Sequence, residues 1–223
     1  NLDRQVARYP RLTRWILDQA THVICLGDKQ RALLAALGCS TPTSIMMNPL
    51  PRAVEASDTP LPTKPYFVFA GEVGPRKGFD TLLDSWQEFA KTPESADVEL
   101  HIVGPILAAS LDRQLPPGVH LLGPRSRAEV LRLMSGARAT VLPSRAEVLP
   151  MVILESLSVG TPAVYTKVGE WAQFASCGDV YLIEQSGPPD AVAKRICGAF
   201  QTLGEPTAEG RSRAAEWVQA QAG

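Results

Sequence analysis

The segment Glu147-Val-Leu-Pro-Met-Val-Ile-Leu-Glu155 decides the fold of this chain, because two carboxylates there enclose seven apolar or proline residues. Just upstream, residues 139–142 (Ala-Thr-Val-Leu) have the composition of a buried strand. Pro150 suits the first turn of a helix, where its missing N–H costs no hydrogen bond. The segment therefore predicts a buried strand, a loop that carries Glu147 and a helix that carries Glu155.

This order places both carboxylates near the carboxyl end of the strand and the first turn of the helix. The N–H groups of residues near 149–152, other than Pro150, which has none, would have no partner within the helix, and such groups attract an anion such as a phosphate. With the anion held by the backbone, two carboxylates remain to accept hydrogen bonds from sugar hydroxyls. The segment favours a nucleotide-sugar pocket, and the alternative is a solvated pair of acids spaced by chance.

The region resembles the Glu-x7-Glu signature of family-4 retaining glycosyltransferases. The resemblance rests on the order of strand, Pro143-Ser144, Glu147, Leu149-Pro150-Met151, Leu154-Glu155-Ser156 and Gly160-Thr161-Pro162. It implies the GT-B fold, in which two Rossmann-like domains face each other. It also implies transfer of a sugar from a nucleotide-sugar donor with retention of the anomeric configuration.

Strand-like and helix-like patterns alternate along the chain, which predicts an α/β fold with a parallel sheet and helices on both faces. About six strands are expected from residue 66 onward. One helix is expected near 106–115, and another should open with the capping box Ser126-x-x-Glu129. A short helix is expected near 170–176.

The resemblance also suggests a division of the chain. Residues 66–205 correspond to a nucleotide-sugar donor-binding domain, followed by a C-terminal helix at 206–223. Residues 1–50 resemble the tail of the N-terminal, acceptor-side domain and should form a partial second α/β unit. Residues 51–65 contain four prolines and no periodicity, which is typical of a linker.

Most of the acceptor-side domain has no counterpart in this sequence, so the resemblance leaves the activity of this chain alone in question. The first residue is Asn rather than Met, which indicates a fragment or a processed chain. The acceptor could be a glycan, a lipid-linked molecule or a small molecule. Peripheral contact with the inner face of a membrane would involve the missing part.

A second motif follows the strand expected at 66–70, namely Gly71-Glu72-Val73-Gly74-Pro75-Arg76-Lys77-Gly78. In the resembling family, a Gly-Arg pair followed by Lys-Gly clamps the donor diphosphate. Lys77 matches, Glu72 replaces the arginine, and Arg76 is the candidate substitute. A cation before a helix N-terminus adds to the helix dipole and can neutralise a leaving diphosphate.

The resemblance assigns roles to the remaining candidates. Glu147 and Lys77 are the catalytic candidates, with Glu147 binding sugar hydroxyls, and Glu155 should accept hydrogen bonds from the ribose. Other candidates for donor contacts are Gly71, Arg76, Gly123, Pro124, Arg125, Leu149, Pro150 and Met151. Arg125 could instead be an ordinary exposed residue of a turn. In the loop after residue 165, Glu170 and Gln173 replace a glycine and a glutamate of the family, which weakens any expectation of sugar contacts there.

Bulk properties exclude several other classes. The net charge of −1 gives no sign of nucleic-acid binding. The four cysteines form no C-x-x-C pair and no ligand cluster with the three histidines, which favours reduced thiols and a cytoplasmic location. His101 and His120 lie in apolar strand patterns and are interpreted as structural. No metal and no cofactor are implied, and the nucleotide-sugar would be a substrate.

Two alternatives stay open. A non-catalytic nucleotide-binding or scaffold module is favoured by Glu72, Gln173 and the missing acceptor domain, and opposed by Lys77, Glu147 and Glu155. A flavodoxin-like domain shares the alternating pattern, but it would need an acidic phosphoacceptor or a flavin phosphate loop after the first strand. The sugar, the base and the acceptor are not specified by the sequence.

Overall fold

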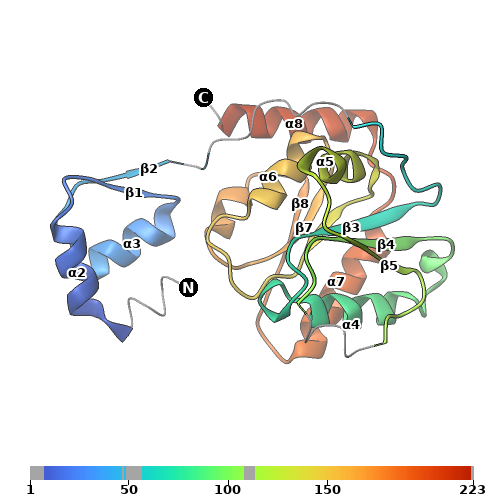
Figure 1. The fold of residues 1–223 in the computed structure, drawn as a ribbon, viewed down its shortest axis with the longest axis horizontal. Helices are drawn as coiled ribbons and strands as arrows, with labels where there is room; N and C mark the ends of the chain where they lie inside the picture. Colours follow the sequence, from blue (N-terminus) through green and yellow to red (C-terminus); the bar gives the residue numbers. More distant parts are fainter. Residues whose placement is uncertain (1–7, 47, 49–56, 108–113, 222–223) are drawn as a thin grey trace.

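The computed structural model describes residues 8–46, 48, 57–107 and 114–221 of the 223-residue chain. It contains a six-stranded parallel sheet with helices on both faces, and a smaller unit with a separate two-stranded parallel sheet (Figure 1). The expected α/β fold class is confirmed.

The six strands run in the order β5-β4-β3-β6-β7-β8, and every pair is parallel. The strand order reverses between β3 and β6, so the sheet has a switch point where ligands of open α/β sheets usually bind. The strands are β3 (Tyr66–Ala70), β4 (Glu99–Val103), β5 (Val119–Gly123), β6 (Thr140–Leu142), β7 (Ala163–Thr166) and β8 (Val180–Ile183).

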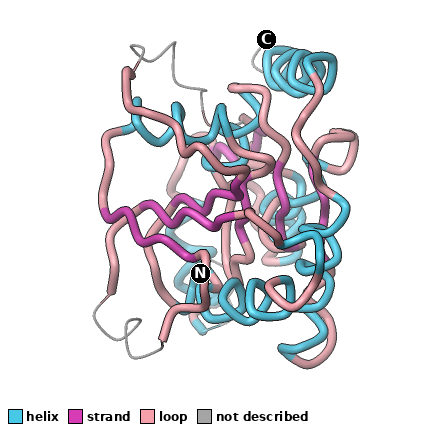
Figure 2. Tube along the Cα trace, turned by 90° about the vertical axis from the view of Figure 1, so that its right-hand side faces the viewer, coloured by secondary structure: helices cyan, strands magenta, loops and turns pink. Residues whose placement is uncertain are grey.

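Helices cover the sheet from two sides, as Figures 1 and 2 both show. Helices α5 (Arg127–Gly136), α6 (Met151–Ser158) and α8 (Ala208–Gln221) lie above it in Figure 1, and α4 (Phe79–Phe89) and α7 (Pro189–Thr202) lie below. The alternation along β3 explains this arrangement. Phe67 packs against Trp86, Phe89 and Phe200 of α4 and α7, whereas its neighbour Tyr66 belongs to the cluster on the α5 side.

The smaller unit consists of α2 (Pro10–Asp18), β1 (Val23–Cys25), α3 (Asp28–Ala36) and β2 (Thr43–Ile45). Its strands pair only with each other among the described residues, so residues 8–46 form the separate α/β element that the sequence predicted. The domain boundaries themselves remain a prediction. Residues 57–65 contain neither helix nor strand, and residues 49–56 of the expected linker lie outside the described residues.

Three local expectations differ from the structure. Ile106 is not helical but bridges Val73, because the chain after β4 continues beside the loop that follows β3; residues 108–113 lie outside the described range. The element expected at 170–176 is the 3-10 helix η4 (Trp171–Phe174). Pro150 precedes α6 rather than lying in its first turn, since its ψ of 105° is extended. Within the described part of the chain, no helix is long and apolar enough to cross a membrane.

Candidate functional site

The loops that follow β3 and β6 meet at the switch point of the sheet. The loop after β3 ends in the 3-10 helix η1 (Pro75–Lys77) and then in Gly78, whose φ of 72° is left-handed. A Cβ at Gly78 would lie 1.9 Å from the carbonyl oxygen of Pro143 in the loop after β6. This position therefore requires glycine for its conformation and for the close approach of the two loops.

Lys77 and Glu147 form an ion pair between these loops. The Lys77 Nζ atom lies 2.7 Å from Glu147 Oε1, and the two side chains are only 15% and 9% exposed. Ser144 Oγ donates a hydrogen bond of 2.7 Å to the same oxygen. A buried carboxylate with a cation and a hydroxyl donor is held in one orientation, so this acid is pre-positioned.

The Lys77 side chain runs beside Gly71. A Cβ placed on Gly71 would lie 3.7 Å from Lys77 Cε, which is an ordinary van der Waals contact, so the lysine stem does not itself require glycine there. The φ of 150° is what favours glycine at this position.

Ser144 is itself fixed by two donors to its carbonyl oxygen. Thr166 Oγ1 donates at 2.6 Å and Gln185 Nε2 at 2.7 Å. Nearby, the buried Tyr165 hydroxyl donates to the Val168 carbonyl oxygen. Burial, together with the Glu147 and Glu170 carboxylates, raises the pKa of Tyr165 well above its usual range, so this phenol stays neutral. The surroundings of Glu147 are therefore ordered before any ligand binds.

Arg145 ties the two loops together and was not identified from the sequence. The Arg145 guanidinium donates to the Pro75 carbonyl oxygen and to Asp80 Oδ2. The backbone N–H of Arg145 donates to the carbonyl oxygen of Arg76. Burial raises the pKa of Asp80, but the Arg145 guanidinium outweighs this and holds it below the usual value. The only available signal was an arginine immediately after the Pro-Ser turn.

Glu155 lies beside the start of α5 rather than beside Lys77. Its Oε1 atom is 3.0 Å from Arg127 Nε, a partner that the sequence analysis missed. The loop Gly123-Pro124-Arg125 leads into the same helix, and Gly123 has a left-handed φ of 68° with open space around its Cβ position. The structure thus places Glu155 beside the start of the helix that follows the loop predicted to contact the base.

The remaining candidates are less constrained. Arg76 is exposed, and its carbonyl oxygen rather than its guanidinium contacts Arg145. Arg125 is also exposed and lies near Glu129, at 3.9 Å. Leu149, Pro150 and Met151 lead into α6, and no side chain among the described residues caps the start of that helix. The assignments of these residues to the donor remain predictions.

Glu170 and Gln173 contact the smaller unit. Glu170 is 4% exposed, and its two carboxylate oxygens accept hydrogen bonds from the backbone N–H groups of Lys29 (3.0 Å) and Gln30 (2.8 Å). Gln173 Nε2 donates to the carbonyl oxygen of Leu26 at 2.5 Å. Glu170 therefore caps the N-terminus of α3 from the other unit, a role that no local pattern in the sequence indicated.

The observed placement of these two side chains uses the space that the missing side chain of Gly27 leaves at the start of α3. Gly27 occupies the N-cap position and offers no side chain to the helix. A Cβ there would lie 2.3 Å from Glu170 Oε2 and from Gln173 Nε2. The two residues that depart from the family pattern after β7 are thus explained by the interface between the two units.

Comparisons with known proteins identify the family of this chain. Residues 64–202 match the family described as glycosyl transferases group 1. An uncharacterised glycosyltransferase of Methanocaldococcus jannaschii is 26% identical over 147 residues, which cover 62% of this chain and 40% of that protein. The chain therefore spans less than half the length of this relative.

Solved structures share the fold at low sequence identity. Sucrose-phosphate synthase from Thermosynechococcus elongatus superposes with a TM-score of 0.73 at 20% identity, over 96% of this chain and 57% of that one. Anabaena HepE, solved with UDP and glucose, superposes with a TM-score of 0.70 at 18% identity, over 95% of this chain and 61% of that one. Pneumococcal O-GlcNAc transferase GtfA, solved with UDP and GlcNAc, superposes with a TM-score of 0.69 at 19% identity, over 96% of this chain and 44% of that one.

The expected GT-B type of fold is thus confirmed by superposition, and the family match extends over more than half of the chain. The matched range includes the loops after β3 and β6 that hold Lys77 and Glu147. This chain belongs to the glycosyl transferases group 1 family.

Proposed function

We propose that this chain is the donor-binding half of a family-4 glycosyltransferase that uses a nucleoside-diphosphate sugar and retains the anomeric configuration. The observation that carries the proposal is the Lys77–Glu147 pair at the switch point of the sheet. An ammonium and a carboxylate that are both largely removed from water interact more strongly with a ligand than solvated groups do. This pair offers one group of each sign to a polar substrate.

In the proposed reaction, the bond between the anomeric carbon and the diphosphate oxygen breaks, the acceptor oxygen bonds to the same face of the sugar, and the acceptor's proton passes to the departing diphosphate. Lys77 stabilises the charge that grows on the diphosphate, with the N-terminus of α6 and Arg76 as further positive groups. Glu147 accepts hydrogen bonds from sugar hydroxyls and stabilises positive charge on the ring. The proposal includes no metal cofactor, because these groups supply the positive charge.

Glu155 is proposed to accept hydrogen bonds from the ribose hydroxyls, while the Gly123-Pro124-Arg125 loop contacts the base. Its ion pair with Arg127 orients the carboxylate from the side of α5. The UDP complexes of HepE and GtfA support a nucleoside diphosphate as the leaving group. They do not define the base or the sugar for this chain; calorimetry with a panel of nucleoside diphosphates would identify the base, and a panel of nucleotide-sugars would identify the sugar.

Glu155→Gln tests nucleotide binding. It should weaken binding of the preferred nucleoside diphosphate by about 1.5–3 kcal/mol, the scale for hydrogen bonds to a charged group, or roughly ten- to hundredfold in Kd. Removing the ribose hydroxyls from the ligand should lower the binding free energy of the wild type by a similar amount and that of the variant by almost nothing. The matched control is Glu205→Gln, since Glu205 forms a similar pair with Arg138 at 3.2 Å. Equal losses in wild type and Glu155→Gln would separate Glu155 from the ribose.

Lys77→Met tests catalysis in the full-length protein that carries this chain. Because the charge on the diphosphate grows toward the transition state, kcat should fall by about a hundredfold, with a smaller change in KM. Lys167→Met is the control, because it removes another lysine that is paired with a glutamate, Glu184. The anomeric configuration of the product, determined by NMR, tests retention separately.

The competing proposal is a nucleotide-binding scaffold without turnover, and Glu72 is the residue that favours it. An acid near a diphosphate repels it, so Glu72→Arg should preserve or increase transfer if Glu72 is merely tolerated. Transfer that is absent in the wild type while nucleotide binding persists would support the scaffold. Gln173 no longer favours this alternative, since its side chain is committed to the contact with Leu26.

A further inference from the structure

Two histidines and a glutamate gather on one face of the sheet, away from the loops that hold Lys77 and Glu147. Glu99 and His101 are two positions apart on β4, so their side chains point to the same face. His120 is the register partner of His101 on the neighbouring strand β5. Glu99 and His120 lie toward the amino ends of their strands and His101 lies at the middle of β4, whereas the donor loops follow the carboxyl ends of β3 and β6.

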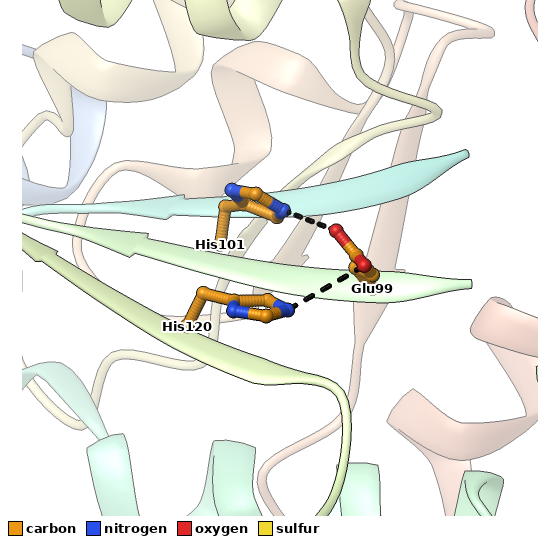
Figure 3. A group of neighbouring side chains, drawn as sticks. All are labelled: Glu99, His101 and His120. Atoms are coloured by element: carbon orange, nitrogen blue, oxygen red, sulfur yellow. Dashed lines mark hydrogen bonds and ion pairs between the residues drawn. The ribbon is translucent and has the colours of Figure 1, made fainter. Parts of the chain in front are cut away.

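The three side chains converge on a common point (Figure 3). Glu99 Oε2 lies 2.9 Å from His101 Nε2, and Glu99 Oε1 lies 3.6 Å from His120 Nε2. One candidate ligand atom from each residue can be chosen so that all three are within 4.8 Å of one another. Both imidazoles therefore direct the same type of nitrogen, Nε2, toward a single carboxylate.

The surroundings fix this arrangement. His101 is 8% exposed and packs against the Tyr66 ring at a centroid distance of 5.1 Å. Its Nδ1 atom is buried and has no hydrogen-bond partner among the described residues, so Nε2 is the nitrogen that faces the other polar groups. His120 is half-exposed at the edge strand of the sheet, which gives an ion access to the group.

A bound cation would replace the proton that Nε2 of His101 donates to Glu99, because a metal-bound imidazole offers the lone pair of that nitrogen to the ion. The nearest competing cation is Lys64, whose Nζ lies 3.8 Å from Glu99 Oε1 on an exposed, flexible side chain.

We propose that Glu99, His101 and His120 bind one divalent transition-metal ion, with Zn²⁺ as the leading candidate and water completing its coordination. Two imidazole nitrogens and one carboxylate oxygen are ligands that Zn²⁺ accepts in proteins. Ligands about 2.0–2.2 Å from Zn²⁺ at tetrahedral angles lie roughly 3.3–3.6 Å apart. His101 Nε2 lies 2.9 Å from one carboxylate oxygen of Glu99, and His120 Nε2 lies 3.6 Å from the other. One ligand atom from each residue fits within 4.8 Å, so small side-chain rotations would bring the three atoms into this range.

The metal would connect the edge strand β5 to β4 and stabilise the sheet from the side opposite the donor loops. It would take no part in sugar transfer. The alternative for these residues is a hydrogen-bonded His-Glu-His group without metal, with Lys64 as the counter-ion. The two alternatives differ in how Lys64 should act, because its ammonium would oppose a bound cation but stabilise a bare carboxylate.

Calorimetry of the chelator-treated chain with zinc chloride tests the proposal. We expect one Zn²⁺ per chain in the wild type and a rise in Tm on binding, since the ligand binds the folded state. His120→Gln and Glu99→Gln should weaken binding at least tenfold. His22→Gln is the matched control, because His22 is an exposed histidine paired with Ser44 in the smaller unit, and it should leave binding unchanged.

Two further measurements separate the proposal from its alternatives. Bound Co²⁺ should give visible ligand-field absorption without the near-ultraviolet band that a thiolate ligand adds, which excludes the cysteines. Lys64→Met should strengthen Zn²⁺ binding several-fold. The proposal is overturned if the wild type shows no saturable Zn²⁺ binding, if His120→Gln and Glu99→Gln bind like the wild type, or if Co²⁺ shows a thiolate band.

Discussion

The six-stranded domain buries whole aromatic side chains, such as Phe67, Trp86 and Phe200, between its sheet and helices. The smaller unit, over residues 8–46, buries only two hydrophobic side chains, Cys25 and Leu34. Large apolar residues of that unit, among them Trp15 and Ile16 of α2, are more than half exposed. The domain therefore has a core of its own, whereas the smaller unit gains little stability from internal packing.

The polar contacts show the same asymmetry. Loops of the six-stranded domain are held by residues of the same domain; for example, Arg145 joins the loops after β3 and β6. In contrast, α3 of the smaller unit receives its N-terminal cap from Glu170 of the domain. The smaller unit is therefore completed by the domain, and the loop after β7 links the stability of α3 to that of the domain.

Phe67→Ala should have the largest effect, since it opens a cavity among Trp86, Phe89 and Phe200. We expect a loss of about 3–5 kcal/mol in the free energy of unfolding, measured by urea denaturation followed by circular dichroism. Trp15→Ala is the matching substitution in the smaller unit and should change the free energy of unfolding by less than about 0.5 kcal/mol. A comparable loss for Trp15→Ala would mean that the smaller unit has a core that these contacts do not reveal.

Glu170→Ala should act locally and more weakly. Losing the cap of α3 should cost about 1–2 kcal/mol, seen as faster hydrogen exchange at the amides of Lys29 and Gln30. Exchange in β3 should be unaffected. Glu184→Ala removes a glutamate from the exposed end of β8 and serves as the control. Uniform acceleration across β3 and α3 would show that the two units open together rather than separately.

Acidification should affect the domain through His101. Because burial lowers its pKa below the ordinary value of about 6.5, the unfolded chain takes up a proton first. The free energy of unfolding should therefore fall as pH drops below about 6.5. The groups that face His101 are Glu99 and His120, with Lys64 beyond Glu99. Urea denaturation at several pH values in the presence of a chelator should show a flatter profile for His101→Gln and an unchanged one for His22→Gln.

Cysteine labelling should give the smallest but most selective difference. Burial raises the pKa of both Cys25 in the smaller unit and Cys177 in the domain, so each reacts only when the surrounding structure opens. Mass spectrometry after alkylation should show Cys25 reacting faster than Cys177. Glu170→Ala should accelerate Cys25 alone. Equal rates in the wild type would contradict the proposed difference in local stability.

The sequence predicted much of this structure because its signals are local. Alternating apolar runs identified the strands from β3 to β8, and the capping box at Ser126 and Glu129 is present at the start of α5. The Lys77 and Glu147 candidates could be placed on their loops in the same way. Local patterns failed where the chain pairs at a distance, as in the bridge from Ile106 to Val73.

The partners of the candidate residues were also missed for this reason. Arg127 contacts Glu155 across 28 positions, Arg145 contacts Asp80 across 65, and Glu170 contacts Lys29 across 141. No periodicity within a single element encodes such pairs. Glu170 and Gln173 depart from the family pattern, and their role depends on Gly27, which lies next to them in space but far away in the sequence.

The close approach at Gly27 also limits how this protein can change over evolutionary time. A Cβ at position 27 would lie 2.3 Å from the ends of the Glu170 and Gln173 side chains, which would have to move aside. A serine or aspartate at 27, the usual way to cap α3, would therefore displace the cap that Glu170 supplies. Gly27 and Glu170 should thus tend to be exchanged together in related sequences, because either residue can provide a cap but both caps cannot occupy the same place.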